Sequence, residues 1–376
     1  MKRGREKAEA REAEGAQGKG DEEPRGSVVP KPPLSPVASL GDIMGGASPR
    51  LIEHSDPLRR VVLSANGNLQ RIVSSFYNAA VRVSAIRHEL VAPNTYGRKV
   101  HLSVHGVIFC VARSTIHLSR PDVIEAMANG VSIGQLFRHL NILPAFELLG
   151  YSFEEEADAE PALGAVRSFW RKYTLHSDGL HCEIHETLRR DLFELPPAEL
   201  PAEPEDESEG SLGDLMAPGS TYLRLPDGFT ARERMLLTAN GNVERIVSSY
   251  HAMPVAAYVI SNHKRHDSPV FDRQVALLMQ GRQFMLAKST VFLTQQDWVD
   301  FVVKDGNPLG EVFRRKGVMP TFKLHSVGRG DKYFWRCYQL SSAGMTCEIT
   351  ETFSVDVFDP IEPANGESHG GELRFV

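Results

Sequence analysis

Each half of this 376-residue chain directs one arginine and one glutamate toward apolar surroundings. Successive side chains of a strand point to opposite faces, so Arg98 and Glu186 should share their strand faces with apolar side chains. Arg273 and Glu351 do the same in the second half. The apolar neighbours are Val100 and Leu102 for Arg98, Cys182 and Ile184 for Glu186, Val275 and Leu277 for Arg273, and Cys347 and Ile349 for Glu351. An unpaired buried ion costs several kcal/mol, so each side chain must meet an opposite charge or a ligand.

These arginines and glutamates can satisfy that constraint in two ways. In the first, Arg98 pairs with Glu186, and Arg273 with Glu351, as structural ion pairs that bridge two strands; spacing alone favours this arrangement. In the second, the arginine binds a ligand carboxylate through two hydrogen bonds inside a small closed pocket. The glutamate then faces a hydroxyl or ether oxygen at the other end of the ligand. The first arrangement suits an interaction protein, and the second an enzyme or a ligand-binding protein.

A long internal duplication carries these residues twice. Residues 63–75 read LSANGNLQRIVSS, and residues 237–249 read LTANGNVERIVSS. The repeat begins earlier, because SLGDIM at residues 39–44 returns as SLGDLM at residues 211–216. Later landmarks recur in the same order, namely Trp170-Arg171 with Trp335-Arg336, and CEIHET from Cys182 with CEITET from Cys347. A match of this length indicates a duplicated domain rather than a solenoid, whose units span about 20 to 50 residues.

Helical spacing follows the Asn-Gly-Asn motif of each repeat. Leu69, Ile72, Val73 and Phe76 predict a helix that starts after Asn68. We expect the Asn68 side chain, and that of Asn242 in the second copy, to accept a hydrogen bond from an amide of the first turn. Short helices are predicted further along, over residues 121–129, 133–140, 296–303 and 309–315.

Alternating apolar residues predict strands over residues 99–112 and 274–287, broken by turns at Gly106 and Gly281. Two final strands of each repeat should meet at Gly179 or Gly344. Antiparallel hairpins with helices packed on one side define an α+β class, here as two tandem domains that each carry an antiparallel sheet.

Composition divides the chain into domains, a linker and tails. We expect a disordered tail over residues 1–36, the first domain over 37–195, an acidic, proline-rich linker over 196–210, the second domain over 211–360 and a flexible tail over 361–376. A hydrophobic content of 41% supports two cores.

Charge and cysteine content exclude several classes of function. A formal net charge of -6 argues against a nucleic-acid partner, whose binding surface requires clustered lysine and arginine. The sequence shows neither a membrane-length apolar run nor a signal-peptide pattern, so we expect a cytoplasmic protein without a membrane partner. The four cysteines lack CxxC spacing and should be free thiols. Neither a metal ion nor a nucleotide cofactor is predicted.

The order of these landmarks resembles the chorismate pyruvate-lyase family, whose fold is shared with the UTRA ligand-sensing domain of GntR-type bacterial regulators. In the second repeat, residues Leu236 to Ile246 match a turn and a short helix of the family, and this helix ends in an arginine followed by an aliphatic residue. Arg273 lies on a strand with Gly281 eight residues later, and Pro308-Leu309-Gly310 opens a helix. Gly344 precedes Glu351 by seven residues. The resemblance covers essentially each whole repeat.

The resemblance implies roles for these positions. The strand arginine, Arg273 or Arg98, would bind the ring carboxylate. Backbone amides at two helix starts would complete that site, and amides at a helix N-terminus are natural receptors for a carboxylate. These amides belong to Asn242 and Leu309, or to Asn68 and Ile133. Lys288 or Arg113 matches a basic position that would neutralise a second carboxylate, although a solvated surface cation fits equally well.

The implied reaction converts chorismate to 4-hydroxybenzoate and pyruvate without a cofactor, with Glu351 or Glu186 protonating the departing ether oxygen. The alternative is a non-catalytic sensor or carrier that binds a small aromatic or cyclic carboxylate in the same pocket. In either case, we expect the two domains to pack as an intramolecular pseudo-dimer.

Overall fold

The computed structural model describes residues 56–128, 136–137, 143–153, 160–196, 213–217, 220–266, 268–304, 313 and 317–361. The N-terminal tail expected over residues 1–36 lies outside these ranges, as do nearly all of the linker over 196–210 and of the tail over 361–376. Ile133 and Leu309 also lie outside them, with most of their predicted helices.

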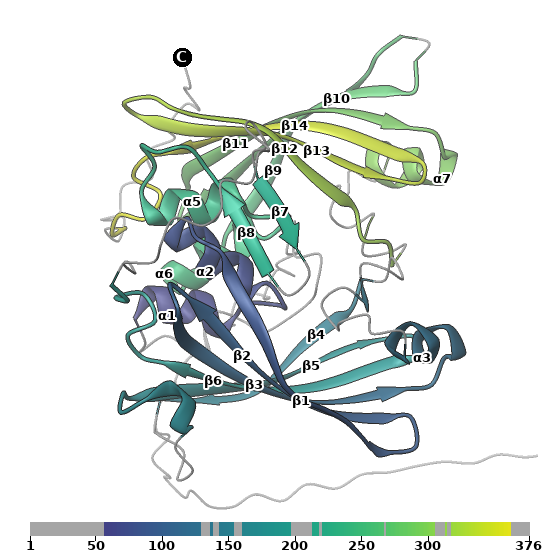
Figure 1. Cartoon of the computed structure of the whole chain (residues 1–376). Coiled ribbons are helices and arrows are strands. Elements are labelled where there is room, and N and C mark those ends of the chain that lie inside the picture. The colour runs from purple at the N-terminus through teal and green to yellow at the C-terminus, as the bar shows by residue number, and fades with distance from the viewer. Residues whose placement is uncertain are drawn as a thin grey trace, which may run out of the picture. The chain divides into compact units, whose positions relative to one another are not determined.

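The first repeat forms two short helices and an antiparallel sheet (Figure 1). Helices α1 (Pro57–Leu63) and α2 (Leu69–Tyr77) precede the strands. The strands are β1 (Val81–Ala92), β2 (Thr95–Val104), β3 (Val107–Leu118), β4 (Ala145–Ser152), β5 (Ser168–Ser177) and β6 (Leu180–Arg189). Helix α3 (Pro121–Ala128) follows β3, and the short 3-10 helix η2 (Pro161–Leu163) precedes β5.

The second repeat has the same order of helices and strands, except that its described residues include no counterpart of η2. Its helices are α5 (Ala231–Leu237), α6 (Val243–His251), α7 (Gln296–Val299) and the π-helix η3 (Asp300–Lys304). Its sheet contains β9 (Ala256–Lys264), β10 (Val270–Met279), β11 (Arg282–Leu293), β12 (Thr321–Arg329), β13 (Tyr333–Ser342) and β14 (Met345–Ser354). The strand order is β12-β13-β14-β11-β10-β9, and the first sheet repeats it as β4-β5-β6-β3-β2-β1. Two antiparallel sheets with helices confirm the α+β class.

The first sheet is extended by two strands from the start of the second repeat. Strand β8 (Ser220–Arg224) pairs with β1, and β7 (Gly213–Ala217) pairs with β8. Residues of the region expected to open the second domain thus add an edge to the sheet of the first (Figure 1).

Tight turns connect the strands at the predicted glycines. His105 and Gly106 both have positive φ, as do Gln280 and Gly281, and this conformation is typical of a type I′ hairpin. The predicted turns at Gly106 and Gly281 are therefore confirmed.

Helices α2 and α6 begin directly after Asn68 and Asn242, as predicted, but neither asparagine side chain caps its helix. The backbone explains the difference. Asp56 and Thr230 do cap α1 and α5, and their ψ angles of 138° and 159° are extended. The asparagines have ψ angles of only 21° and 12°, outside the extended region that side-chain capping normally uses.

Helices of the two repeats contact each other through matching hydrogen bonds. Arg60 of α1 donates to the carbonyl oxygens of Ser249 (2.9 Å) and Tyr250 at the end of α6. Arg234 of α5 donates in the same way to Ser75 (2.9 Å) and Phe76 at the end of α2. Further matching contacts join Ser64 to Ser249, Ser75 to Thr238, Arg71 to the Thr238 carbonyl, and Arg245 to the Ser64 carbonyl.

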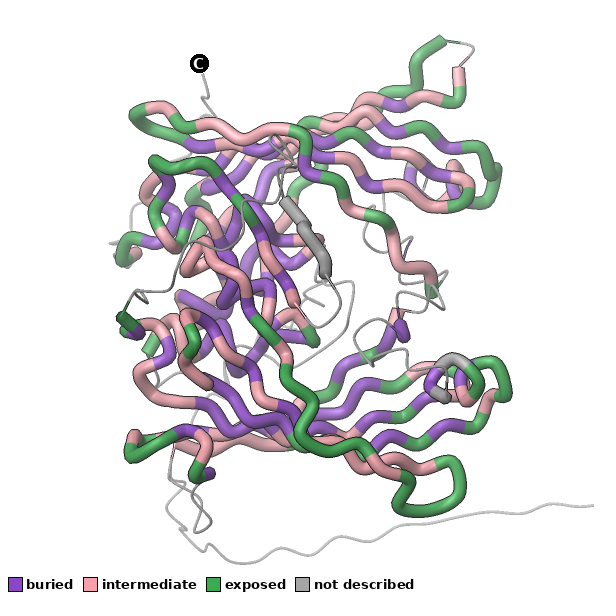
Figure 2. The backbone as a smooth tube through the Cα atoms, viewed as in Figure 1, coloured by how far each residue is buried: buried purple, intermediate pink, exposed green. Residues whose placement is uncertain are grey.

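Apolar burial follows the same helices. The largest hydrophobic cluster includes Val61, Ala65 and Ile72 of the first repeat among side chains of the second. In Figure 2 the tube is largely buried along these helices, and burial alternates along many of the strands. Within the described ranges, no helix is long and apolar enough to cross a membrane.

We predict that Arg60→Met lowers the free energy of unfolding by about 2–3 kcal/mol, because two buried carbonyl groups lose a charged donor. Arg224 is exposed on β8, so Arg224→Met is the matched control and should change little. Urea unfolding followed by circular dichroism measures both. Equal stability of the two variants would show that these inter-repeat bonds contribute nothing.

Candidate functional site

Strand pairing places the predicted arginines and glutamates on one face of each sheet. In the first repeat, Arg98, Ser114, Ile184 and Tyr173 are directly opposite one another across β2, β3, β6 and β5. The adjacent row on this face contains Val100, Ala112, Glu186 and Arg171. The second repeat has identical residue types in both rows, Arg273, Ser289, Ile349 and Tyr338 in one and Val275, Ala287, Glu351 and Arg336 in the other.

Glu186 forms a buried ion pair, but its partner is Arg171 rather than Arg98. The Arg171 Nε lies 2.7 Å from Glu186 Oε2, and the Tyr173 hydroxyl donates to Oε1 at 2.9 Å. Arg171 is fully buried and Glu186 is 5% exposed. Burial holds the pKa of Tyr173 well above its ordinary value, so its hydroxyl remains a donor.

Glu351 has the same surroundings. Arg336 Nε lies 2.7 Å from Glu351 Oε2, and the Tyr338 hydroxyl donates to Oε1 at 2.9 Å. The expected direct pairs Arg98–Glu186 and Arg273–Glu351 are therefore wrong. Register gives the reason: Arg171 is directly opposite Glu186 on the neighbouring strand, whereas Arg98 is two strands away, about 10 Å at ordinary strand spacing.

The paired arginines, Arg171 and Arg336, also bind the helical layer. Arg171 Nη1 donates to the carbonyl oxygens of Val62 and Ala65, each at 2.6 Å, at the end of α1. Arg336 Nη1 donates to the carbonyls of Leu237 and Ala239 at the end of α5. Each paired arginine thus joins a glutamate of the sheet to carbonyl groups at a helix end.

Among the strand arginines, Arg98 has no carboxylate neighbour in the described part of the chain. Arg98 is partly buried and Arg273 is 2% exposed. Burial lowers the pKa of both guanidinium groups, and the titratable groups that oppose this effect are the thiols of Cys182 and Cys347. Within the described part of the chain, Arg98 makes neither an ion pair nor a hydrogen bond.

Aromatic and apolar side chains lie on the same face as the strand arginines. Tyr173 is in the row of Arg98, and its ring packs against Phe146 with centroids 5.2 Å apart. Tyr338 and Phe322 form the matching pair at 5.0 Å. Arg98, which can bind a carboxylate, thus shares one sheet face with rings that can pack on a cyclic ligand, three strands away or about 14 Å at ordinary strand spacing.

Arg113 and Lys288, also predicted for the site, do not join this face. Arg113 and Lys288 are adjacent in sequence to Ser114 and Ser289, so alternation directs them to the opposite face. Arg113 forms an ion pair with Glu160 there. Asn68 and Asn242 lie at the helix starts without capping bonds, and Ile133 and Leu309 fall outside the described residues.

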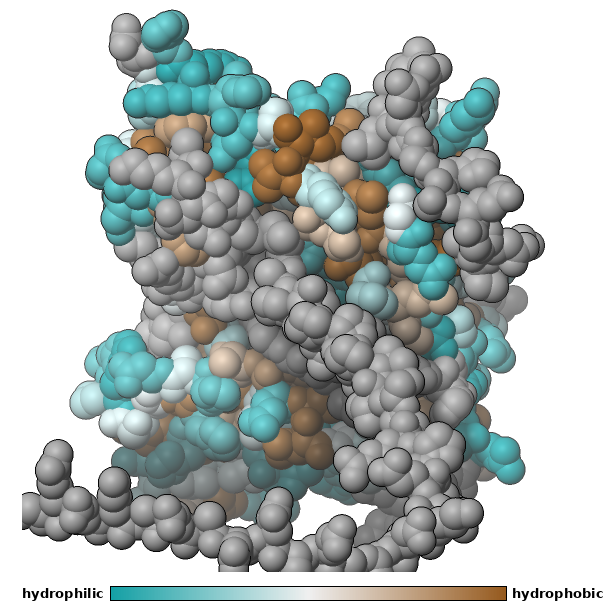
Figure 3. Space-filling view, turned by 180° about the vertical axis from the view of Figure 1, so that it is seen from behind, coloured by the Kyte–Doolittle hydropathy of each residue, from teal (hydrophilic) through white to brown (hydrophobic). Residues whose placement is uncertain are grey.

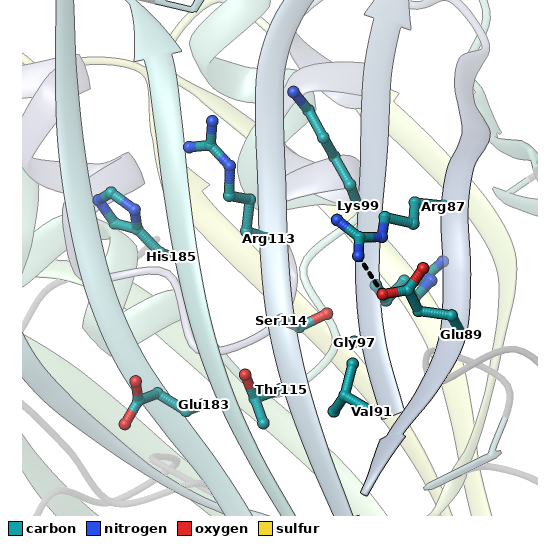
Figure 4. A pocket seen from close by; sticks show the side chains of 11 residues that line it. Arg87, Glu89, Val91, Gly97, Lys99, Arg113, Ser114, Thr115, Glu183 and His185 are labelled. Carbon is teal, nitrogen blue, oxygen red and sulfur yellow. Dashed lines mark hydrogen bonds and ion pairs between the residues drawn. The ribbon is translucent and has the colours of Figure 1, made fainter. Parts of the chain in front are cut away.

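The opposite face of the first sheet carries a groove of about 300 Å³ (Figure 4). Basic side chains line it, but carboxylates already pair with them. Arg87 contacts Glu89, and Glu160 contacts both Lys99 and Arg113. Because these carboxylates neutralise the basic side chains, the groove attracts an anionic ligand less strongly than its arginines and lysine alone suggest.

Comparison with known proteins leaves the family open. No protein-family model matches the chain, and no curated protein does. Among solved structures, it is similar to a possible transcriptional regulator, YydK, from Bacillus subtilis subsp. subtilis str. 168. The identity is 12%, the match covers 42% of this chain and 77% of that chain, and the TM-score is 0.22. A similarity this weak carries no argument about function.

We predict that Arg336→Met destabilises the protein by about 3–5 kcal/mol, because it leaves the buried Glu351 carboxylate without its charged partner. Tyr338→Phe should cost only about 0.5–1.5 kcal/mol, since it removes one hydrogen bond. Arg265→Met breaks an exposed pair with Asp272 and should have little effect. Chemical denaturation ranks the three variants. A stable Arg336→Met protein would show that the pair is not a structural anchor.

Thiol reactivity should separate one cysteine from the other three. Burial raises the pKa of Cys182 to about 12 and also raises those of Cys110 and Cys347, so these groups remain protonated thiols at pH 8. Only Cys337 is partly exposed among the four cysteines. Ellman's reagent should therefore titrate about one thiol in the native protein and four in urea. Rapid reaction of a second native thiol, or of any thiol in Cys337→Ser, would contradict this burial.

Proposed function

We propose that each repeat binds a small aromatic or cyclic carboxylate on the inward face of its sheet, and that the glutamate of that face is structural. The environment of Arg98 is the observation that supports this proposal most directly. Its guanidinium is partly buried in apolar surroundings, and the described residues supply no carboxylate to it. Arg273 would have the same role in the second repeat, where it is more deeply buried.

Binding energy would come from the charge of the strand arginine and from the aromatic rings farther along the same sheet face. A carboxylate can accept two parallel hydrogen bonds from a guanidinium, an arrangement stronger than one neutral hydrogen bond. The ligand carboxylate would also supply the opposite charge that a guanidinium requires when it is buried. The ring of the ligand would pack against Tyr173 and Phe146, or against Tyr338 and Phe322.

The geometry supports binding in preference to lyase chemistry. Both oxygens of Glu186 accept hydrogen bonds, one from Arg171 and one from Tyr173. Proton donation to a departing ether oxygen would require this carboxylate to leave those donors and carry a proton. The resemblance to both chorismate lyases and UTRA sensing domains supplies the ligand class, and the sensing alternative fits the bonded glutamate better.

In this proposal, the two repeats act as an intramolecular pseudo-dimer, supported by the matching hydrogen bonds between their helices. The protein would work without a cofactor, in the reducing cytoplasm, where its four free cysteines remain thiols.

We predict that 4-hydroxybenzoate raises the thermal unfolding midpoint and that Arg98→Met or Arg273→Met removes part of this shift. A ligand at one hundred times its Kd stabilises a folded protein by about 2.7 kcal/mol for each site. Phenol, which lacks the carboxylate, should give no shift, and Lys288→Met should behave like the unaltered protein. Full ligand stabilisation in the double variant Arg98→Met/Arg273→Met would refute the site.

Incubation with chorismate tests the alternative that the protein is a lyase. We expect no pyruvate above the spontaneous background. Pyruvate release that disappears in Glu186→Gln or Glu351→Gln, while that variant remains folded, would establish a lyase and contradict a purely structural glutamate.

A further inference from the structure

Arg71 and Arg245 each extend from a helix of one repeat to the other repeat. Arg71 of α2 donates through Nη1 to the Thr238 carbonyl at 2.9 Å, and Arg245 of α6 donates to the Ser64 carbonyl at 3.1 Å. Both arginines are only 8% exposed. They therefore belong to the interior rather than to the surface, where apolar side chains form patches between polar ones (Figure 3).

Each of these arginines binds a helix end that a paired arginine also binds. The Thr238 carbonyl lies in sequence between two carbonyls, at the end of α5, that accept hydrogen bonds from Arg336. The Ser64 carbonyl lies in the same way between two that accept from Arg171 at the end of α1. The C-terminal end of a helix carries a partial negative charge, which favours cations. Each helix end thus binds one guanidinium from its own repeat and one from the other.

The same two arginines reach aromatic rings of the other repeat. The Arg71 Cζ lies 5.8 Å from the centre of the Phe322 ring, and the Arg245 Cζ lies 5.9 Å from the centre of the Phe146 ring. A guanidinium within about 6 Å of an aromatic face is attracted by the ring, and more strongly when both groups are shielded from water. The Arg336 Cζ is also 5.8 Å from the Phe322 ring. The Phe322 ring therefore contacts a guanidinium of each repeat.

Further contacts between the repeats lie close to Phe146. The Leu143 amide, three residues before Phe146, donates to the Gly317 carbonyl at 3.3 Å. Met319 packs against the hydrophobic cluster of the first repeat that contains Phe146 and Tyr173. The aromatic pair of the first repeat thus lies at its boundary with the second.

We propose that each ligand site is shared between the repeats, with Arg245 positioning Phe146 in the first site and Arg71 positioning Phe322 in the second. This inference rests on the proposed function, in which the ring of the ligand packs against these phenylalanines. Arg71 and Arg245 are positioning residues, because they act on the ring that the ligand contacts. Neither site is then complete without the other repeat, and this gives the duplication a functional reason.

Single-site variants of the full chain test this exchange of arginines. Arg98→Met leaves the second site and Arg273→Met leaves the first, and isothermal titration calorimetry measures the binding of 4-hydroxybenzoate to each. In the Arg98→Met protein, Arg71→Met should raise the Kd about tenfold, the size of a cation–π contact shielded from water, and Arg245→Met should leave it unchanged. In the Arg273→Met protein, the two effects should be reversed. If only one single-site protein binds, its two variants decide.

Arg234 provides the matched control. It also extends to the other repeat, where it donates to the carbonyls of Ser75 and Phe76, but among the described residues it contacts neither aromatic pair. Arg234→Met should lower the stability and leave the Kd of both sites unchanged. Circular dichroism without ligand shows whether each variant is folded. Arg71→Lys and Arg245→Lys, which keep the charge, replace a methionine variant that does not fold and should weaken the same site by a smaller factor.

The outcomes are distinct. Loss of affinity at the site of the opposite repeat supports the shared sites. Equal weakening of both sites, weakening of the site in the arginine's own repeat, or unchanged affinity at both sites overturns the proposal and assigns Arg71 and Arg245 a purely structural role. An unaltered protein that does not bind 4-hydroxybenzoate refutes the proposed function and this inference with it. Binding that is lost only in Arg98→Met/Arg273→Met supports the proposed function whatever Arg71 and Arg245 do.

Discussion

The buried pairs Arg171–Glu186 and Arg336–Glu351 are the interactions on which the rest of the structure depends. Each arginine satisfies a carboxylate of the sheet on one side and helix-terminal carbonyls on the other. Because charges and carbonyls buried in this way are costly unless every one is bonded, helix and sheet can meet only in an arrangement that satisfies both. The pair therefore fixes the ends of α1 and α5, from which α2 and α6 continue.

Because the two pairs fix the helices on the sheets, they also determine which partners the remaining polar groups can reach. With the helices fixed, Arg60 and Arg234 reach the helix ends of the opposite repeat, and the two repeats become mutually dependent. On the same sheet face, Glu186 is already bonded to Arg171, and Arg98 is the charge to which we assign the proposed ligand. In the proposed function, a binding site and a structural anchor would occupy adjacent rows of one face, and this would explain why the sequence pattern resembles a catalytic arginine and glutamate.

Much of this architecture is predictable from local sequence. Alternation correctly assigns Arg98 and Glu186 to one face, and the positive-φ residues at Gly106 and Gly281 mark the hairpins. Alternation does not reveal which strands are neighbours, however. The partner of Glu186 depends on β5 pairing with β6, and the Trp170-Arg171 repeat was the available signal. The failure of Asn68 to cap α2 depends on one backbone angle, and the pairing of β8 with β1 joins residues far apart in the chain.

The most direct test of the central claim is a crystal structure of the protein with 4-hydroxybenzoate. We predict that the ligand carboxylate lies against Arg98 or Arg273 and that its ring contacts Tyr173 or Tyr338. Glu186 and Glu351 should remain bonded to Arg171 and Arg336, at the distances of 2.7 Å seen without ligand. A ligand bound away from the strand arginines, or a glutamate released from its arginine to face the ligand, would contradict the account.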